Sequence, residues 1–419
     1  MDARKNIESA LEIAAKGLGL SVPGDAGRVA HPKDISNGDY ATGLALATAK
    51  QKGTTPRQLA EEIVAKLGAI EGVAKIEIAG AGFINFYLTP QALAESLEQA
   101  RTEDMWGSID LNKGKKILVE YTDPNPFKEF HIGHLMSNAI GESIARLFQF
   151  SGAEVKRANY QGDVGPHVAK AIWGIIRLGA DPHDAKQIGK AYAAGAQAYE
   201  SDEGAKAEID SINAKVYDGS DMEINGLYAA VRQTSLDHFE EIYKTLGTKF
   251  DYYFFESATA PKGVEIVKAH TDVFVESDGA IVYKGEQDGL HTRVFITSKG
   301  LPTYETKELG LAEMKYEMWP SDISVTITAN EQTDYFAVVL AAMRKIMPEI
   351  AEKIRHVTHG MMRLPSGKMS SRTGDVITGE SLLGDLIEQA KIRAAESRAD
   401  NRDELAQSVA VGAIKYQIL

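Results

Sequence analysis

Residues 117–159, ILVEYTDPNPFKEFHIGHLMSNAIGESIARLFQFSGAEVKRAN, decide the fold of this chain. They begin with a short apolar run, Ile117–Tyr121, of the kind that forms buried parallel strands. A Pro/Asn turn follows at Asp123–Pro126, and then a long amphipathic stretch that Gly152 ends. A second candidate strand lies at Val155–Asn159. Strand, loop, helix and strand in this order predict a βαβ unit, and hence an α/β fold with a Rossmann-type doubly wound parallel sheet.

The rest of the chain is organised around this unit. Later strands of the same sheet are expected at Val294–Thr297 and Ile323–Thr328, and the Ala-, Glu- and Asp-rich residues between the two halves predict a helical insertion. Upstream, helical patterns and two strand patterns indicate a small α/β module. We therefore expect three parts: a small α/β domain at 1–112, the sheet domain at 113–380 with its insertion at about 168–290, and a helical region at 381–419.

Composition excludes several classes of protein. Hydrophobic residues at 44% and charged residues at 25% are typical of a soluble globular protein. No apolar run could span a bilayer and no secretory signal opens the chain, so we expect a cytoplasmic protein without a membrane partner. The absence of cysteine excludes disulfides, thiolate zinc sites and a cysteine nucleophile. A net charge of -13 argues against nucleic-acid binding over the whole surface but leaves a local basic face open.

Two histidines, His131 and His134, stand with Gly133 at the expected start of the long helix. A helix N-terminus favours phosphate, the glycine permits close approach of a flat ring such as adenine, and imidazole donors can stabilise charge that develops on phosphates. Four residues alone are equally consistent with a helix start that happens to contain two histidines. Their position directly after a strand and a Pro-Asn-Pro loop favours a nucleotide site.

A second motif, Lys368-Met-Ser-Ser-Arg372, lies late in the chain between Gly367 and Gly374. A glycine-flanked loop with cationic and hydroxyl groups suits transient binding of a triphosphate. Basic Gly/Ser loops are common and usually just solvated, so this segment is informative only together with the first motif.

Together the two motifs resemble the paired ATP signatures of class I aminoacyl-tRNA synthetases, and their flanks resemble the arginyl enzymes. The similar blocks occur in the family's order and cover most of residues 31–380; they are Gly38–Thr42, Gly82–Phe86, Glu120–His134, Asn159–Gly165, Gly300–Glu308 and Ala329–Gln332. The resemblance implies ligation of L-arginine to tRNA(Arg), with ATP and Mg²⁺ as cofactors.

The resemblance also implies roles for individual residues. The catalytic groups would be Lys128, His131, His134 and Lys368; the ATP site Asn125, His131, Gly133, His134, Lys368 and Ser370; and the arginine pocket Glu120, Asn125, Tyr304, Glu308 and Gln332. Phe83 and Asn85 would contact tRNA, and no protein metal ligand is expected. A guanidinium is a planar, charged fork, so a pair of carboxylates suits it. Without the resemblance, Glu308 would be interpreted as a surface glutamate and Tyr304 as a core aromatic. For Phe83, an ordinary strand residue of the core is an interpretation of equal weight even with the resemblance.

Three positions depart from the family pattern. Glu308 stands where the family usually has aspartate, so its carboxylate reaches farther. Ser371 stands where the common signature has a second lysine, and Lys128 just before the first signature is expected to substitute for it. Val164 replaces a tryptophan, and nothing in the sequence explains this change.

Other functions stay open at this point. Another class I synthetase, cysteinyl or glutamyl, is the nearest rival, although a chain without cysteine lacks the usual zinc ligands of the cysteinyl enzyme. A small-molecule nucleotidyltransferase and a catalytically silent tRNA-binding relative are further alternatives.

Ser408–Leu419 resembles the first helix of the family's anticodon-binding domain, so we expect most of that domain to be missing. The family also implies a monomer and a need for bound tRNA before arginine is activated.

Overall fold

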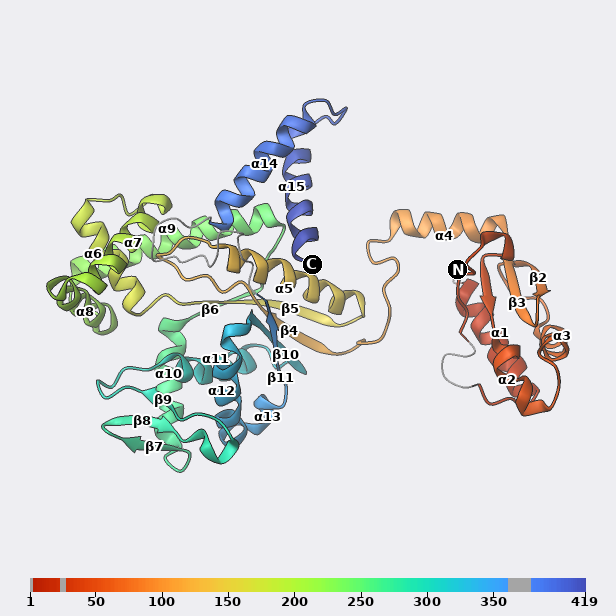
Figure 1. Ribbon diagram of the computed structural model, residues 1–419, viewed down its shortest axis with the longest axis horizontal. Helices are drawn as coiled ribbons and strands as arrows, with labels where there is room; N and C mark the ends of the chain where they lie inside the picture. The colour runs from red at the N-terminus through yellow and green to blue at the C-terminus, as the bar shows by residue number, and fades with distance from the viewer. Residues whose placement is uncertain (1–2, 23–27, 361–377) are drawn as a thin grey trace. The chain divides into compact units, whose positions relative to one another are not determined.

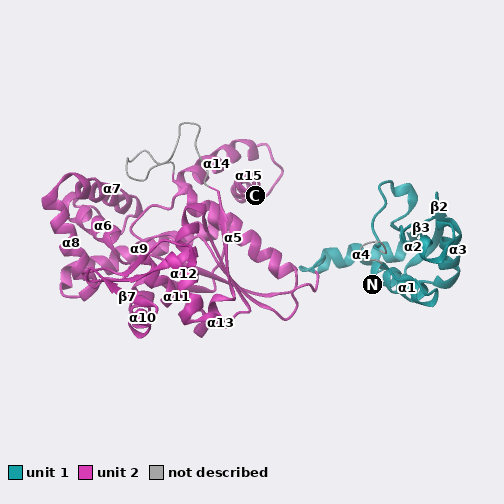
Figure 2. Ribbon diagram, turned by 60° about the horizontal axis from the view of Figure 1, so that its bottom comes forward, with its two compact units in different colours: residues 1–108 teal, residues 109–419 magenta. Residues whose placement is uncertain are grey.

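The structure is a computed structural model that describes residues 3–22, 28–360 and 378–419. It divides into two units, residues 1–108 and residues 109–419, which Figure 2 shows in different colours. Within the described ranges, no helix has both the length and the apolarity that crossing a membrane requires.

A five-stranded parallel sheet forms the centre of the larger unit (Figure 1). In spatial order its strands are β11 (Ile354–His359), β10 (Ile323–Ala329), β4 (Lys116–Glu120), β5 (Glu154–Gln161) and β6 (Tyr252–Phe255). Helix α5 (Ile132–Phe150) connects β4 to β5, which confirms the predicted βαβ unit and the Rossmann-type class. The strand order reverses between β4 and β10. In such sheets ligands bind at this reversal, beyond the carboxyl ends of the strands.

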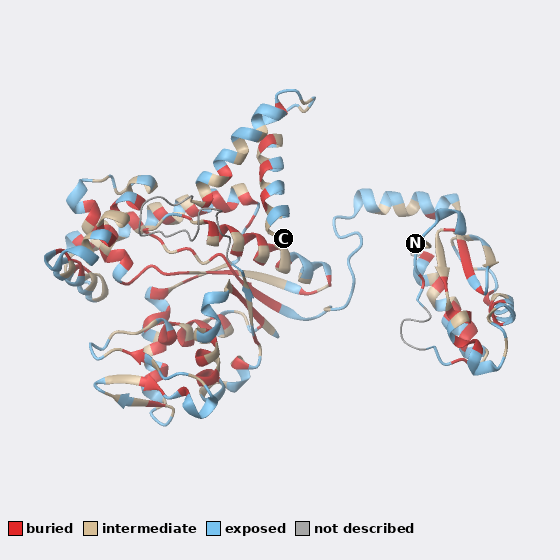
Figure 3. Ribbon diagram, in the orientation of Figure 1, coloured by how far each residue is buried: buried red, intermediate tan, exposed pale blue. Residues whose placement is uncertain are grey.

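Alternating side chains of the strands pack on opposite faces of the sheet. On one face, Ile117 and Val119 of β4 join a core with α5, α9 (Met222–Leu246), α14 (Gly379–Ala394) and α15 (Arg402–Ile418). On the other face, Leu118 packs with Leu311 of α11 (Tyr304–Met318). Figure 3 shows the strands of this sheet mostly buried or intermediate, with β4 and β10 the most buried. The sheet is therefore covered on both sides, as a doubly wound fold requires.

Two long connections separate the strands of the sheet. Between β5 and β6 the chain forms α6 (Pro166–Leu178), α7 (Ala185–Ser201), α8 (Glu203–Asp218) and α9. Between β6 and β10 it forms α10 (Glu256–Ala269), β7 (Phe274–Ser277), β8 (Ala280–Tyr283), β9 (Arg293–Ile296) and α11. The remaining helices before β11 are α12 (Thr333–Ile346) and α13 (Pro348–Ala351). The region expected as one insertion thus contains β6, a strand of the central sheet.

One predicted strand forms, but in a different sheet from the one expected. The expected strand at Val294–Thr297 forms as β9, but β9 pairs antiparallel with β8 in a separate sheet ordered β7-β8-β9. By contrast, the strand expected at Ile323–Thr328 is confirmed as β10 of the central sheet. The sequence indicated a strand in both places, and only the pairing partner distinguishes them.

The smaller unit is an α/β module built on an antiparallel sheet. Its strands are ordered β1 (Tyr40–Thr42), β3 (Phe83–Leu88) and β2 (Val73–Ala79). Its helices are α1 (Ala3–Gly17), α2 (Leu44–Lys52), α3 (Pro56–Leu67) and α4 (Pro90–Thr102). Helix α3 begins where its sequence requires, since Thr55 and Gln58 form a capping box and Pro56 occupies the first turn.

Candidate functional site

The loop that follows β4 crosses the point where the strand order of the sheet reverses. It contains three non-glycine residues with positive φ: Thr122 (79°), Asp123 (44°) and Phe127 (71°). Positive φ is uncommon for residues other than glycine, and side chains of two neighbouring helices hold the loop backbone in this conformation. The N–H of Thr122 donates to Ser137 Oγ of α5 at 2.9 Å, and the N–H of Phe127 donates to Ser235 Oγ of α9 at 3.1 Å. The loop that carries Asn125 and Lys128 is therefore fixed from two helices.

His131 and His134 cap the N-terminus of α5 together. His131 Nδ1 accepts from the N–H of Gly133 at 3.1 Å, and His134 Nδ1 accepts from the N–H of His131 at 3.2 Å. The two rings are stacked, with centroids 3.5 Å apart. Because both Nδ1 atoms are acceptors, each neutral ring carries its hydrogen on Nε2. Burial lowers the pKa of His131 to about 4 and that of His134 well below its usual value, so both are neutral donors at neutral pH.

Lys128 brings a cation close to these histidines. Burial, together with repulsion from Lys170, lowers its pKa to about 8, and Glu256 partly offsets the effect. At pH 7 the ammonium is still mostly charged, although it has lost much of its hydration. A weakly hydrated cation beside a helix N-terminus suits an anionic ligand such as a phosphate.

Three interacting carboxyl groups, Glu120, Asp123 and Glu308, lie at the end of β4, in the loop that follows it and on α11. Glu120, at the end of β4, is paired with Lys315 of α11 at 2.9 Å, and both side chains are buried. Asp123 Oδ1 accepts from the N–H of Tyr160 at 2.7 Å. Burial and the charge of Glu120 raise the pKa of Asp123 well above its usual value and raise that of Glu308 to about 8. The three carboxyl groups could together carry more negative charge than the single ammonium of Lys315 neutralises, so a further cation would be stabilised there.

The other predicted pocket residues border the same region. Asn125 lies directly against Gly162 at the end of β5, where an added Cβ would be 2.2 Å from Asn125 Oδ1. Tyr304 is the first residue of α11, one turn before Glu308, and it is 60% exposed rather than part of the core. Gln332 is exposed just after β10, at the end of the 3-10 turn η4 (Asn330–Gln332). The elements that carry these residues therefore meet around the reversal between β4 and β10.

Sequence analysis missed a second buried polar network beside this region. Lys307 pairs with Glu256 at 2.5 Å, and both are buried. Asp163, fully buried, accepts from the N–H and the hydroxyl of Ser257 at 2.8 Å each and from Arg232 at 2.9 Å. Asp163 and Lys307 lie within blocks whose resemblance was noted, but their partners are distant in sequence, so no local signal could identify the network.

The remaining predicted residues lie elsewhere. Lys368 and Ser370 fall outside the described residues. Phe83 and Asn85 belong to the smaller unit, on the face of β3 opposite to the buried Ile84 and Phe86. Phe83 is 48% exposed and Asn85 only 3%, so Phe83 is not the core residue that the alternative interpretation expected.

Comparison with known proteins agrees with this geometry. Residues 96–419 match the family "tRNA synthetases class I (R), catalytic domain", and residues 1–88 match the "Arginyl tRNA synthetase N terminal domain". The arginine–tRNA ligase of Limosilactobacillus reuteri is 31% identical over 404 residues, covering 94% of this chain and 71% of that protein. That of Treponema denticola is 28% identical over 407 residues, covering 93% of this chain and 69% of that protein.

Solved structures agree in fold. The Thermus thermophilus arginyl-tRNA synthetase superposes with a TM-score of 0.68 at 23% identity, covering 99% of this chain and 75% of that chain. The arginyl-tRNA synthetase of Plasmodium falciparum superposes with a TM-score of 0.62 at 21% identity, covering 99% and 73%. The chain belongs to the arginyl-tRNA synthetase family of class I aminoacyl-tRNA synthetases, the arginine–tRNA ligases.

Proposed function

We propose that this chain ligates arginine to tRNA(Arg) in two steps at the carboxyl ends of β4 and β10. The carboxylate of arginine attacks the α-phosphorus of ATP, which gives arginyl-adenylate and pyrophosphate. The terminal ribose hydroxyl of tRNA then attacks the adenylate carbonyl and releases AMP. The first step needs no general base because a carboxylate is already a nucleophile. Positioning and charge stabilisation carry the catalysis.

The acidic cluster at the end of β4 is the observation that carries this assignment. Glu308 and Asp123 have raised pKa values because they are shielded from water next to the charge of Glu120, which the nearby Lys315 offsets only in part. A guanidinium placed among them would add charge-assisted hydrogen bonds, and its planar fork matches a carboxylate in bidentate geometry. Substrates without those donors would leave the buried carboxyl groups unpaired, which favours arginine strongly. Asn125, Tyr304 and Gln332 complete the proposed pocket.

The phosphates of ATP are assigned to the N-terminus of α5. His131 and His134 would donate through Nε2–H, Gly133 would allow close approach of the nucleotide, and Lys128 would stabilise charge on the phosphates. Mg²⁺ would enter with ATP, bound mainly by phosphate oxygens and water. Lys368 and Ser370 are proposed as further ATP contacts from sequence resemblance alone.

The partners beyond arginine and ATP are assigned by family and sequence. Phe83 is proposed to contact an unstacked base of tRNA(Arg), since an exposed aromatic face suits such a base; Asn85, only 3% exposed, is proposed as a contact from sequence resemblance alone. We also propose a monomer that acts in the cytoplasm, as the sequence led us to expect.

A thermal-unfolding panel of the twenty amino acids, each with and without a non-hydrolysable ATP analogue and with tRNA(Arg) present, tests the pocket. A ligand at about one hundred times its Kd stabilises the protein by about 2.7 kcal/mol, which is an easily measured shift in Tm. Arginine alone should give the shift, and Glu308→Gln should reduce it. A shift with another amino acid would refute the arginine pocket, and no shift with any of them would favour the catalytically silent alternative.

A further inference from the structure

Helix α7 of the insertion lies against the loop before α5 through two contacts one turn apart. The ammonium nitrogen of Lys128 is 5.1 Å from the centre of the Tyr192 ring. At Gly189, one turn earlier in α7, an added Cβ would be 2.6 Å from Cγ of Glu129. A side chain at position 189 would therefore push the helix and the loop apart. Two consecutive loop residues are thus in contact with one face of α7.

An aromatic ring is a suitable partner for a lysine that has to act on an anion. A cation over the face of a ring is attracted by the ring quadrupole, and more strongly where water is excluded. A carboxylate in the same place would neutralise the ammonium and repel a triphosphate. The ring holds the ammonium without cancelling its charge. This matters for lysine in particular, because its four-carbon chain is flexible and does not fix its own charge in space.

We propose that Tyr192 is a positioning residue for arginine activation: its ring holds the Lys128 ammonium beside the phosphate-binding end of α5. The insertion thereby contributes to catalysis without touching substrate. This inference rests on the proposed function, since it takes Lys128 as a cation that stabilises the phosphates.

Three variants of the intact chain test the proposal: Tyr192→Leu, which removes the ring; Tyr192→Phe, which keeps it; and Tyr199→Leu. Tyr199 is the matched control because it lies on the same helix, in cation–π contact with Lys170 at 4.2 Å. Two quantities are measured for each. One is the pKa of Lys128, from the pH dependence of its acylation followed by peptide mass spectrometry. The other is kcat and KM for ATP in ATP–pyrophosphate exchange with tRNA(Arg) present.

Loss of the ring should lower the Lys128 pKa below about 8, because the charged form loses a stabilising contact while the site stays apolar. The same variant should lose about 5- to 30-fold in kcat, with a smaller change in KM for ATP. Tyr192→Phe should match the wild type in both measurements, and Tyr199→Leu, which keeps the ring over Lys128, should leave kcat unchanged.

The proposal is overturned if Tyr192→Leu keeps the wild-type Lys128 pKa and kcat, or if Tyr192→Phe is as damaging as Tyr192→Leu. Should Tyr192→Leu fail to fold in a thermal-unfolding check, Tyr192→Met takes its place with the same expected results. A wild-type chain without exchange activity would remove the proposed function and this role together. An active wild type with an unaffected Tyr192→Leu would remove only the role of Tyr192.

Discussion

His131 and Glu308 are both partly buried, and this burial disfavours the charged form of each. For the histidine this lowers the pKa to about 4, and for the glutamate it raises the pKa to about 8. The histidine is therefore a neutral donor under all ordinary conditions, whereas the glutamate is mostly protonated until a cation arrives. Both shifts have direct consequences that can be measured on single residues.

The first consequence concerns the protonation of His131. Selective ¹⁵N labelling of histidine and NMR should show its ring as the Nε2–H tautomer from pH 8 down to about pH 5. His238 provides an internal control, since its contact with Glu380 at 2.9 Å raises its pKa. It should become charged at a pH above the ordinary histidine value of about 6.5. A His131 ring that titrates alongside His238 would contradict the neutral-donor assignment.

The second consequence concerns arginine affinity. A carboxyl group must ionise to pair with a guanidinium, and Glu308 is protonated below about pH 8. Arginine binding should therefore release about one proton at pH 7, and affinity should rise about tenfold per pH unit until it levels above pH 8. Calorimetry in buffers of different ionisation enthalpy measures the proton. The Glu308→Gln variant should bind more weakly and without this pH dependence. Equal wild-type affinity at pH 6.5 and pH 8 would contradict the expectation.

Gly162 offers a test of the position of Asn125. A Cβ at residue 162 would lie 2.2 Å from Asn125 Oδ1, so Gly162→Ala has to displace the amide. A misplacement of about 1 Å at a reacting site costs up to about 100-fold in rate. ATP–pyrophosphate exchange should therefore fall about 10- to 100-fold with little change in Tm. Gly226→Ala is the control, because an added Cβ there meets nothing within 4 Å. Equal activity of the two variants would remove Asn125 from the site.

At the scale of secondary-structure elements, local pattern predicted β4, α5 and β5 but not the partners of every strand. The apolar run of β4 and the amphipathic stretch of α5 are long enough to identify by themselves. By contrast, β6 is a four-residue aromatic segment and β11 is a polar strand at the edge of the sheet, so neither has a clear periodicity. β9 was predicted as a strand but assigned to the wrong sheet, because pairing depends on contacts that local sequence does not contain.

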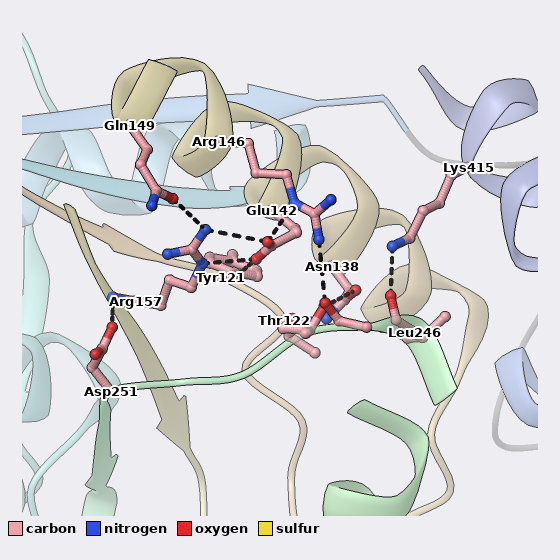
Figure 4. Close-up of polar contacts among 12 residues, drawn as sticks. Tyr121, Thr122, Asn138, Glu142, Arg146, Gln149, Arg157, Leu246, Asp251 and Lys415 are labelled. Carbon is pink, nitrogen blue, oxygen red and sulfur yellow. Dashed lines mark hydrogen bonds and ion pairs between the residues drawn. The ribbon is translucent and has the colours of Figure 1, made fainter. Parts of the chain in front are cut away.

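Helix α5 is attached to the sheet by a buried carboxylate, Glu142 (Figure 4). Glu142 accepts from Tyr121 at 2.5 Å, from Arg146 at 2.7 Å and from Arg157 of β5 at 2.9 Å. Although burial opposes ionisation, these donors together hold its pKa below the ordinary value. The pair of Glu142 with Arg157 thus connects the helix to the neighbouring strand.

Replacement of Glu142 by Gln should destabilise the chain by about 1–3 kcal/mol, since it removes the charge-assisted hydrogen bonds that the partly buried guanidinium of Arg157 donates to Glu142. Arg146→Gln is the control, because its side chain is 59% exposed and an exposed pair contributes about 0–1 kcal/mol. Urea unfolding at pH 7 measures both. A carboxylate with a lowered pKa stabilises above its unfolded pKa, so the effect of Glu142→Gln should shrink as the pH falls below about 4. Equal destabilisation by the two variants at pH 7 would contradict this account.

At the scale of the whole molecule, sequence located much of the candidate site but not what surrounds it. Glu120 ends β4, and Asn125, His131 and His134 follow that strand, so their grouping could be expected from the rule that ligands bind at the carboxyl ends of parallel strands. Lys315 and Tyr192 are 195 and 64 positions from the residues they contact, Glu120 and Lys128. Only the folded chain brings them together, so the neutralisation of Glu120 and the contact of the insertion with Lys128 were not predictable.

The division into two units predicts that tRNA binding and arginine binding can be changed separately. Phe83 is 48% exposed on β3 of the smaller unit, so its loss should not disturb that unit's core. Stacking of a base on an aromatic side chain contributes about 1–3 kcal/mol. Phe83→Ala should therefore weaken tRNA(Arg) binding about 5- to 150-fold in a filter-binding or fluorescence titration, with arginine affinity unchanged.

Trp106 is a matched control for Phe83, since it is an exposed aromatic residue of the same unit at 49% exposure. If Phe83 stacks on a base, Trp106→Ala should leave tRNA affinity within about twofold of the wild type, because a surface substitution away from a contact changes free energy by no more than about 0.5 kcal/mol. Equal losses in both variants would indicate that general surface hydrophobicity, rather than stacking at β3, drives binding. Unchanged affinity in Phe83→Ala would exclude this face of the sheet as the tRNA contact and leave Asn85 without its proposed role.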